Sequence, residues 1–272
     1  MLIGDSLLLV GCGKMGGAML RGWLRRGVRA DDVVVLEPSQ AALADLAAQG
    51  VRLFADAPEL PAKLSPSVVV LAVKPQMMDG VVTGLARFVR PETVFLSIAA
   101  GRTIAYFEQK LGAAAAIVRS MPNTPAAVGR GITVACANGH VSADQRVRCD
   151  ELLAAIGEVA WVEDEALLDA VTAVSGGGPA YVFLLIECLA EAGAAAGLPP
   201  DLAMRLARAT VSGAGELARL SPEPAAVLRQ NVTSPGGTTL EALKILMAPD
   251  GLQPLFTKAI AAATRRSRAL AG

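Results

Sequence analysis

Short apolar runs alternate with helix-like segments through the first part of the chain. Runs of Val, Leu and Ile predict β-strands at residues 7–10, 33–36, 51–54, 68–73, 94–98 and 117–119, with a later pair near 132–136 and 158–162. The run at 68–73 is apolar at every position, which is typical of a parallel strand that helices cover on both faces. Helical segments such as 15–26 and 40–49 lie between the runs. The pattern predicts a doubly wound α/β domain.

The strands end at about residue 162, and the rest of the chain is helical in pattern. Helix-compatible segments cover residues 166–174, 179–196, 200–220, 222–230, 238–247 and 252–271. We therefore expect an α/β domain at residues 1–162 and an all-α domain at 163–272. The segment 179–196 is apolar over most of its circumference, as is usual for a helix buried in its own domain or in a subunit interface. We favour the interface, and hence a homo-oligomer.

Composition narrows the possible functions. Lys and Arg total 25 and Asp and Glu total 25, so the formal net charge is zero. Nucleic-acid binding is therefore disfavoured, because it depends on clustered cations. The four cysteines form no CxxC pair, and the chain has one histidine, so we expect no metal site and no Cys–His nucleophile. Reduced thiols indicate a cytoplasmic protein.

Two features argue against a membrane or secreted protein. The most apolar run, at 180–189, contains Glu187 and is short of the roughly 20 residues that a bilayer span needs. The first residues, MLIGDSLLLVGCG, lack a basic region and a cleavage site, so we expect no signal peptide.

A glycine-rich turn follows the first predicted strand. The motif GCGKMG at residues 11–16 has the GxGxxG spacing between a strand and a helix, which is the context of a dinucleotide-binding loop. Gly11 permits a tight turn, Gly13 lets a pyrophosphate approach the backbone, and Gly16 lets helix and strand pack closely. The helix N-terminus that follows attracts the anion.

Glu37 ends the second predicted strand. A carboxylate at this place binds the ribose hydroxyls of NAD and repels the 2′-phosphate of NADP. Ser39 and Gln40 offer a phosphate site if Glu37 turns away, and a solvent-facing Glu37 is a third interpretation. No arginine stands beside them, so the residues favour NADH weakly.

Two further strand ends complete the cofactor side. Lys74 and Pro75 close the fourth strand, and the small residues SIAAG at 97–101 close the fifth. Ligands bind at the carboxyl edge of such sheets, so together these loops outline one cleft.

A second glycine-rich segment, NVTSPGGTTL at residues 231–240, lies in the helical half. Ser234 is a candidate helix cap, and Gly236 and Gly237 in a first helical turn allow an anion to contact bare backbone N–H groups. A substrate carboxylate fits there, with the hydroxyls of Thr238 and Thr239 within reach. The simpler alternative is a capped helix start with incidental glycines.

Two other motifs leave their roles open. The segment SGGGPAY at 175–181 indicates close backbone contact with a ligand or a neighbouring helix, and MPNTP at 121–125 either touches the cofactor or shapes its own loop. The sequence has no P-loop, no HExxH and no Ser-His-Asp set. Reduction of an iminium needs little acid–base machinery, because the nitrogen already carries the charge.

Taken together, these motifs resemble the pyrroline-5-carboxylate reductases. The resemblance rests on GCGKMG, on AVKPQ at 72–76, on SIAAG, on RSMPNTPAAVG at 119–129, on SGGGPAYVFLLIECLAEAG at 175–193 and on NVTSPGGTTLEAL at 231–243. It implies a Rossmann domain followed by an all-α dimerisation domain, in dimers that often assemble into decamers. The implied reaction is hydride transfer from NAD(P)H to the imine carbon of 1-pyrroline-5-carboxylate, which becomes C5 of L-proline.

The resemblance also implies roles for residues. The substrate carboxylate lies on the N–H groups of Gly237, Thr238 and Thr239, and Thr239 is the polar anchor or proton donor at the ring nitrogen. Implied cofactor residues are Gly13, Lys14, Met15, Lys74, Pro75, Ala99 and Asn231. NADPH is the family's usual cofactor, but many members carry a small or amide residue where this chain has Glu37, so NADH is a serious alternative.

Two other functions remain to be compared. The β-hydroxyacid dehydrogenases pair similar domains but use a lysine on the interdomain helix as acid and base. The helix after residues 176–178 contains no lysine, which argues against alcohol oxidation. A nucleotide-binding oligomer without catalysis is the other alternative.

Overall fold

The computed structural model describes residues 6–271. They divide into two compact units, one made of the residues up to Gly176 and from Ala263 onward, the other of Gly177–Ala262. The last strand ends at Trp161, one residue before the predicted domain boundary, whereas the units divide at Gly176. The assignment of two domains at 1–162 and 163–272 stays a prediction.

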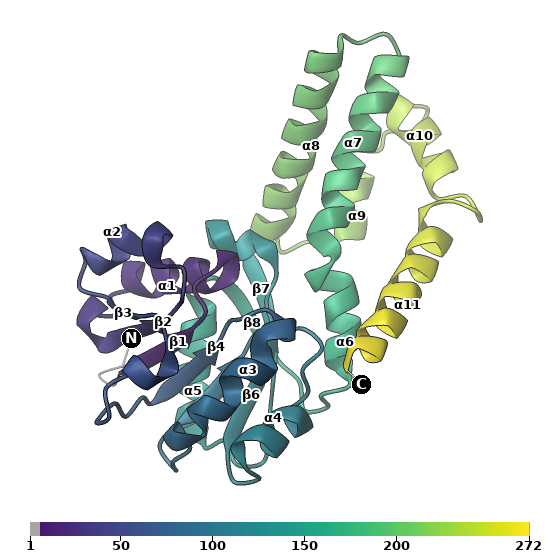
Figure 1. The fold of residues 1–272 in the computed structure, drawn as a ribbon. Coiled ribbons are helices and arrows are strands. Elements are labelled where there is room, and N and C mark those ends of the chain that lie inside the picture. Colours follow the sequence, from purple (N-terminus) through teal and green to yellow (C-terminus); the bar gives the residue numbers. More distant parts are fainter. Residues whose placement is uncertain (1–5, 272) are drawn as a thin grey trace. The chain divides into compact units, whose positions relative to one another are not determined.

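The first unit contains one eight-stranded sheet (Figure 1). Its order is β3-β2-β1-β4-β5-β6-β7-β8, and all neighbours are parallel except β6 and β7. The strands are β1 (Leu7–Val10), β2 (Val33–Leu36), β3 (Arg52–Phe54), β4 (Val68–Leu71), β5 (Val94–Ser97), β6 (Ala116–Met121), β7 (Gly131–Ala137) and β8 (Gly157–Trp161). The predicted doubly wound fold is confirmed.

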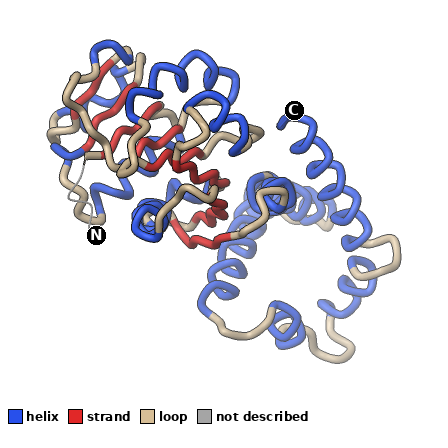
Figure 2. Tube along the Cα trace, turned by 90° about the horizontal axis from the view of Figure 1, so that it is seen from below, coloured by secondary structure: helices blue, strands red, loops and turns tan. Residues whose placement is uncertain are grey.

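Alternate residues of each strand face two separate cores. Leu7 and Leu9 of β1 pack with α1 (Lys14–Arg25) and α5 (Ala143–Ala154) on one face. Leu8 and Val10 pack on the other face, with α3 (Met78–Val82) and α4 (Ile104–Leu111). Figure 2 shows the strands with helices on both sides. Burial on both faces explains why these strands are apolar at every position.

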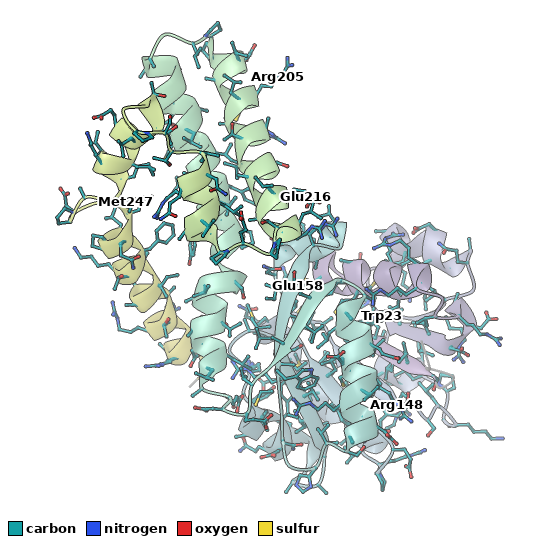
Figure 3. All side chains as sticks on the ribbon, turned by 180° about the vertical axis from the view of Figure 1, so that it is seen from behind. Trp23, Arg148, Glu158, Arg205, Glu216 and Met247 are labelled. Atoms are coloured by element: carbon teal, nitrogen blue, oxygen red, sulfur yellow. The ribbon has the colours of Figure 1, made fainter. Side chains whose placement is uncertain are left out.

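Trp23 joins two helices on the first face. Its side chain is fully buried, and its indole N–H donates to the carbonyl oxygen of Leu152 on α5 at 2.9 Å. Figure 3 labels Trp23 on α1, beside α5. This contact helps to fix α1, the helix whose N-terminus follows the glycine-rich turn.

Several predicted helices are shorter or less regular than expected. The segment predicted as a helix at 40–49 is a 3₁₀ turn followed by a four-residue helix, α2 (Ala44–Ala47). The remaining 3₁₀ turns of this unit are Ala30–Asp32, Ala57–Glu59, Pro75–Met77, Thr83–Phe88 and Thr124–Val128. Pro75 begins a helical turn, because its missing N–H costs nothing there.

The helical part of the chain follows the predicted order. It consists of α6 (Leu167–Val171), a π-helical turn (Thr172–Gly176), α7 (Gly178–Ala195), α8 (Pro200–Leu220), α9 (Ala225–Asn231), α10 (Thr238–Leu246) and α11 (Leu252–Ala271). In the second unit α7 packs on α8, where a Cβ on Gly193 would lie 3.3 Å from that of Ala203. The buried apolar residues of Gly177–Ala262 are three alanines, Ala190, Ala203 and Ala207.

Candidate active site

The turn after β1 has the conformation that its glycines allow. Gly11 has φ of +90°, and a Cβ there would lie 2.9 Å from the carbonyl oxygen of Ala72. A Cβ on Gly16 would lie 2.3 Å from the carbonyl oxygen of Gly11. Gly13 is different, because it is exposed and a Cβ there would meet nothing within 4 Å. Gly11 and Gly16 are therefore required for packing inside the protein, whereas Gly13 leaves open space on its outer side.

The first turn of α1 presents backbone donors to that open side. Gly13 is the N-cap and makes no side-chain cap, and the first turn contains no acidic residue. The N–H groups of Lys14, Met15 and Gly16 have no acceptor within the helix, as in the first turn of any α-helix. Their N–H groups and the helix dipole suit an anion at this place.

The Glu37 carboxylate is held against the glycine-rich turn. One carboxylate oxygen accepts the backbone N–H of Cys12 at 2.8 Å, and the other accepts the N–H of Ser39 at 3.0 Å. Burial and, next, the nearby Glu37 charge raise the pKa of the Cys12 thiol to about 11, so this thiol is neutral at physiological pH. The carboxylate of Glu37 therefore does not point away from the glycine-rich loop, which was one of the alternatives left open by the sequence.

Two more loops lie at the same edge of the sheet. Strands β2, β1, β4 and β5 are parallel neighbours, so their carboxyl ends share one edge. Lys74 is exposed and Pro75 half-buried just past β4, while Ala99 lies buried past β5 and donates its N–H to Ser97 Oγ at 3.2 Å. The structure thus brings together the predicted residues Gly11 to Gly16, Glu37, Lys74, Pro75 and Ala99.

Asn123 of the MPNTP motif shapes its own part of the fold. Its amide oxygen accepts the N–H of Ile132 at 3.0 Å, and its amide nitrogen donates to the carbonyl oxygen of Ser175 at 3.2 Å. Ser175 belongs to the π-helical turn that ends the first unit. Both ends of the Asn123 side chain are therefore used to connect β7 with this turn.

The predicted substrate loop lies in the second unit. Helix α10 begins at Thr238 with Gly237 as its N-cap, so the expected cap at Ser234 is wrong. The N–H of Gly237 donates to the carbonyl oxygen of Ser234 at 3.0 Å, and Gly236 has φ of +70°, a conformation that favours glycine. A tight turn formed by Pro235 and the two glycines therefore precedes the helix, and its carbonyl hydrogen bond takes the place of a serine cap.

The donors of this loop face outward. Gly236, Thr238 and Thr239 are exposed, and the N–H groups of Thr238 and Thr239 have no acceptor within the helix. Asn231 ends α9 and donates its amide to Glu223 at 3.2 Å. Two free N–H groups beside two hydroxyls suit a carboxylate that carries a second polar group.

One residue at the carboxyl edge of the sheet was not among the predicted site residues. Arg102 follows the SIAAG motif, and its guanidinium donates twice to the carbonyl oxygen of Pro75. An arginine directly after a strand-end loop is the signal that could have identified it. Its partner is 27 residues away, which no local pattern reveals.

Comparison with known proteins identifies the family. Residues 165–270 match the family model described as pyrroline-5-carboxylate reductase dimerisation, and residues 6–101 match the model described as NADP oxidoreductase, coenzyme F420-dependent. The pyrroline-5-carboxylate reductase of Pseudomonas aeruginosa is 41% identical over 97% of this chain and 96% of its own length. The chain belongs to the pyrroline-5-carboxylate reductase family. The resemblance seen in the sequence motifs is therefore confirmed.

Solved structures of the family agree with this fold. The reductase from Coxiella burnetii superposes with a TM-score of 0.92 at 36% identity, and the match covers 98% of this chain and 99% of the other. The Plasmodium falciparum reductase, solved with NADP bound, has a TM-score of 0.83 at 28% identity, with 99% of both chains covered. Both units therefore have counterparts in known reductases of this family.

The dimerisation model gives a reason for the exposed apolar surface of α7. Among residues 6–271, the helical stretch Leu167–Ala195 is long and apolar enough to cross a membrane by length and composition alone. We expected no such stretch, because the most apolar run of the sequence is short, but this stretch of 29 residues includes α6, the π-helical turn and α7. Only 11% of its most apolar window is buried within the chain. Since the matched family model is a dimerisation domain, contact with a second subunit explains this surface.

Proposed function

We propose that this protein reduces 1-pyrroline-5-carboxylate to L-proline with a hydride from NAD(P)H, the last step of proline biosynthesis. The observation that carries the proposal is the match to a reductase of this name over 97% of the chain, which includes both the glycine-rich turn and the substrate loop. When bound, a reduced nicotinamide nucleotide supplies the hydride. The protein itself has to bind the nucleotide and the substrate and orient them relative to each other.

The residues after β1 fit a dinucleotide. A pyrophosphate requires close access to the backbone, and the empty space beside Gly13 gives that access. The N–H groups of Lys14 and Met15 at the start of α1 would bind the phosphate oxygens, and the Lys14 and Lys74 side chains would add positive charge. Pro75 and Ala99 would form the floor beneath the nicotinamide half.

Glu37 decides which nucleotide this chain prefers. Its carboxylate is fixed by two backbone N–H groups at the end of β2, which is where the adenine ribose of a dinucleotide lies. A fixed negative charge there accepts hydrogen bonds from two ribose hydroxyls and repels a 2′-phosphate. We therefore expect NADH to be preferred, although NADPH is the family's usual cofactor and the Plasmodium relative was solved with NADP.

The loop before α10 would hold the substrate. The N–H groups of Thr238 and Thr239 would bind its carboxylate, and the tight turn at Gly236 and Gly237 keeps side chains away from it. The Thr239 hydroxyl would hydrogen-bond the ring nitrogen. It orients rather than protonates, because a threonine hydroxyl has a pKa far from neutral.

The reaction does not require a strongly acidic group in the protein. In the protonated imine, hydride addition at the carbon of the C=N bond, which becomes C5 of proline, moves the π electrons onto the nitrogen, which becomes the secondary amine. The nitrogen already carries its proton, so the protein has only to keep the ring plane and C5 in place.

The dimer is the proposed functional assembly. A decamer of such dimers is the proposed higher state, because dimers of this family often assemble into decamers. Its support is the match of residues 165–270 to a dimerisation model and the exposed apolar side chains of α7. A cytoplasmic location is proposed with it, and the four free cysteines are consistent with a reducing compartment.

The test is a comparison of substrates. Purified protein and reduced nucleotide are mixed with 1-pyrroline-5-carboxylate or with a six-membered cyclic imine. In a separate assay, protein and oxidised nucleotide are mixed with a 3-hydroxy acid, and the absorbance of NADH or NADPH is followed in each case. We expect rapid oxidation of the reduced nucleotide with 1-pyrroline-5-carboxylate. We expect no reduction of the oxidised nucleotide with the hydroxy acid. Turnover of the hydroxy acid alone would contradict the proposal.

A further inference from the structure

Arg102 connects the two loops that close the cofactor edge. It stands immediately after the loop of β5, and its Nε and Nη2 atoms lie 3.2 and 2.8 Å from the carbonyl oxygen of Pro75, in the loop of β4. The same carbonyl also accepts the N–H of Met78 in its helical turn. The guanidinium therefore spans the space from the Ala99 loop to the Lys74–Pro75 loop.

Two side chains contact the guanidinium in this position, and a third pairs with one of them. Asp79 on α3 accepts a hydrogen bond from Arg102 Nη2 at 3.1 Å. Tyr106 on α4 carries the guanidinium over its ring, 4.6 Å from the centroid, and donates its hydroxyl to the other Asp79 oxygen at 3.0 Å. Lys110 lies 3.2 Å from that second oxygen. The Arg102 side chain is only 26% exposed as a result.

The electrostatics of the group favour a charged, intact network. Hydrogen bonds from Lys110 and then Tyr106 lower the pKa of Asp79, so its carboxylate stays ionised throughout the neutral range. Pairs as exposed as these contribute little to folding stability. The arrangement instead fixes the orientation of the guanidinium relative to the Pro75 carbonyl, because a planar group that donates twice to one oxygen allows little change of angle.

We propose that Arg102 is a positioning residue for the reduced dinucleotide: it holds the Lys74–Pro75 loop at a fixed place relative to the Ala99 loop. The inference rests on the proposed function, because it takes these two loops as the walls of the dinucleotide site. Arg102 itself donates to protein groups and acts through Pro75. Without it, the Lys74–Pro75 loop samples other positions, and the dinucleotide must order the loop when it binds.

The test uses three variants, a cofactor titration that needs no substrate, and steady-state rates with 1-pyrroline-5-carboxylate. Arg102→Met keeps the apolar stem and removes the donors, and Arg102→Lys keeps the charge without the planar fork. Arg90→Met is the control, because Arg90 also bonds a neighbouring loop, through Ser65 Oγ at 2.8 Å, but lies before β5 at the opposite edge of the sheet. Binding of NADH and NADPH is measured by the fluorescence of the reduced nicotinamide.

We expect Arg102→Met to raise the Kd for the reduced cofactor by about threefold to tenfold, with kcat at saturating cofactor within about twofold of wild type. Arg102→Lys should stay close to Arg102→Met, and Arg90→Met should bind as wild type does. All three variants should unfold at nearly the same temperature.

Three results would overturn the inference. These are an unchanged Kd in Arg102→Met, a lysine variant that binds as tightly as wild type, or a loss of kcat that follows a loss of folded protein. If the wild type binds neither nucleotide, the proposed function fails together with this inference. If it binds them but does not reduce 1-pyrroline-5-carboxylate, only the substrate assignment fails and the Arg102 result still stands.

Discussion

Glu37 and Thr239 are the two side chains to which we assign the most specific roles. Each lies at the start of a backbone turn whose geometry the structure describes: Glu37 accepts the N–H groups of Cys12 and Ser39, and Thr239 lies in the first turn of α10. Both roles depend on a single polar group. Single substitutions therefore test them directly.

Replacing Glu37 should change cofactor preference. In Glu37→Ser the fixed charge is gone and a hydroxyl remains, so the ratio of kcat/KM with NADPH to that with NADH should rise by about tenfold or more, equivalent to about 1.4 kcal/mol. Steady-state rates with each nucleotide give the ratio. Glu92→Ser, at an exposed position before β5, is the control. An unchanged ratio in Glu37→Ser would remove Glu37 from the nucleotide site.

The hydroxyl of Thr239 should matter more than that of Thr238. Thr239→Val keeps the shape and the backbone N–H but loses the hydroxyl, and kcat/KM for 1-pyrroline-5-carboxylate should fall by about 10- to 100-fold. Thr239→Ser should keep most of the activity, and Thr238→Val should lose little. Equal losses in Thr238→Val and Thr239→Val would show that the two hydroxyls have no separate roles.

At this scale the sequence was informative where function depends on local spacing. The conformations of Gly11 and Gly16 could be predicted, because each follows from a few adjacent residues. The roles of Gly13 and Glu37 toward a nucleotide stay predictions, and the two glycines at 236–237 lie before α10 rather than in its first turn. Arg102 was not predictable, since its contact with Pro75 depends on how two strands are placed in the sheet. The Asn123 contact with Ser175 spans 52 residues and was hidden for the same reason.

At the scale of elements, strands were predicted better than helix ends. Four consecutive apolar residues bury both faces of a parallel strand, so β1 and β2 lie where their sequences indicate. The reversed direction of β7 was not predicted, because it depends on the short loop after β6. Nor was the π-helical turn at Thr172–Gly176, where Thr172 and Ser175 donate their hydroxyls to carbonyls four residues earlier.

The glycine-rich turn gives an element-scale prediction. Gly13→Ala adds a methyl group where the protein has open space, so the free energy of unfolding should change by less than about 0.5 kcal/mol. The same methyl group lies where the pyrophosphate should approach, so the Kd for NADH should rise by about tenfold or more. Thermal unfolding and fluorescence titration measure the two effects.

Gly16→Ala is the matched comparison. Its Cβ would lie 2.3 Å from the carbonyl oxygen of Gly11, so we expect a loss of about 1–3 kcal/mol in stability together with the loss of binding. If Gly13→Ala binds NADH as wild type does, the pyrophosphate does not lie on this turn.

At the scale of the whole molecule, the second unit does not have a core of its own. Its buried apolar residues are alanines, while Phe183 and Leu184 on α7 are 59% and 57% exposed. Large apolar side chains left exposed along one helix indicate a surface that another chain covers. The sequence predicted this interface from the composition of one helix, but it contains no information on the number of subunits.

A charge on this surface should separate the subunits. Phe183→Asp places a carboxylate among the exposed apolar side chains of α7, and we expect its subunit affinity to fall by about 100-fold or more. Light scattering coupled to size exclusion should then show monomers at concentrations where the wild type is oligomeric. Val147→Asp is the control, because Val147 is 55% exposed on α5, outside the dimerisation domain. An oligomer unchanged in Phe183→Asp would place the interface elsewhere.

The reductase activity is tested by following the hydride itself. Purified protein is given 1-pyrroline-5-carboxylate and NADH that carries deuterium at the transferable C4 position, and the product is examined by mass spectrometry and NMR. We expect L-proline with a single deuterium at C5, formed in step with the oxidised nucleotide. Unlabelled proline, or oxidised nucleotide without proline, would contradict it.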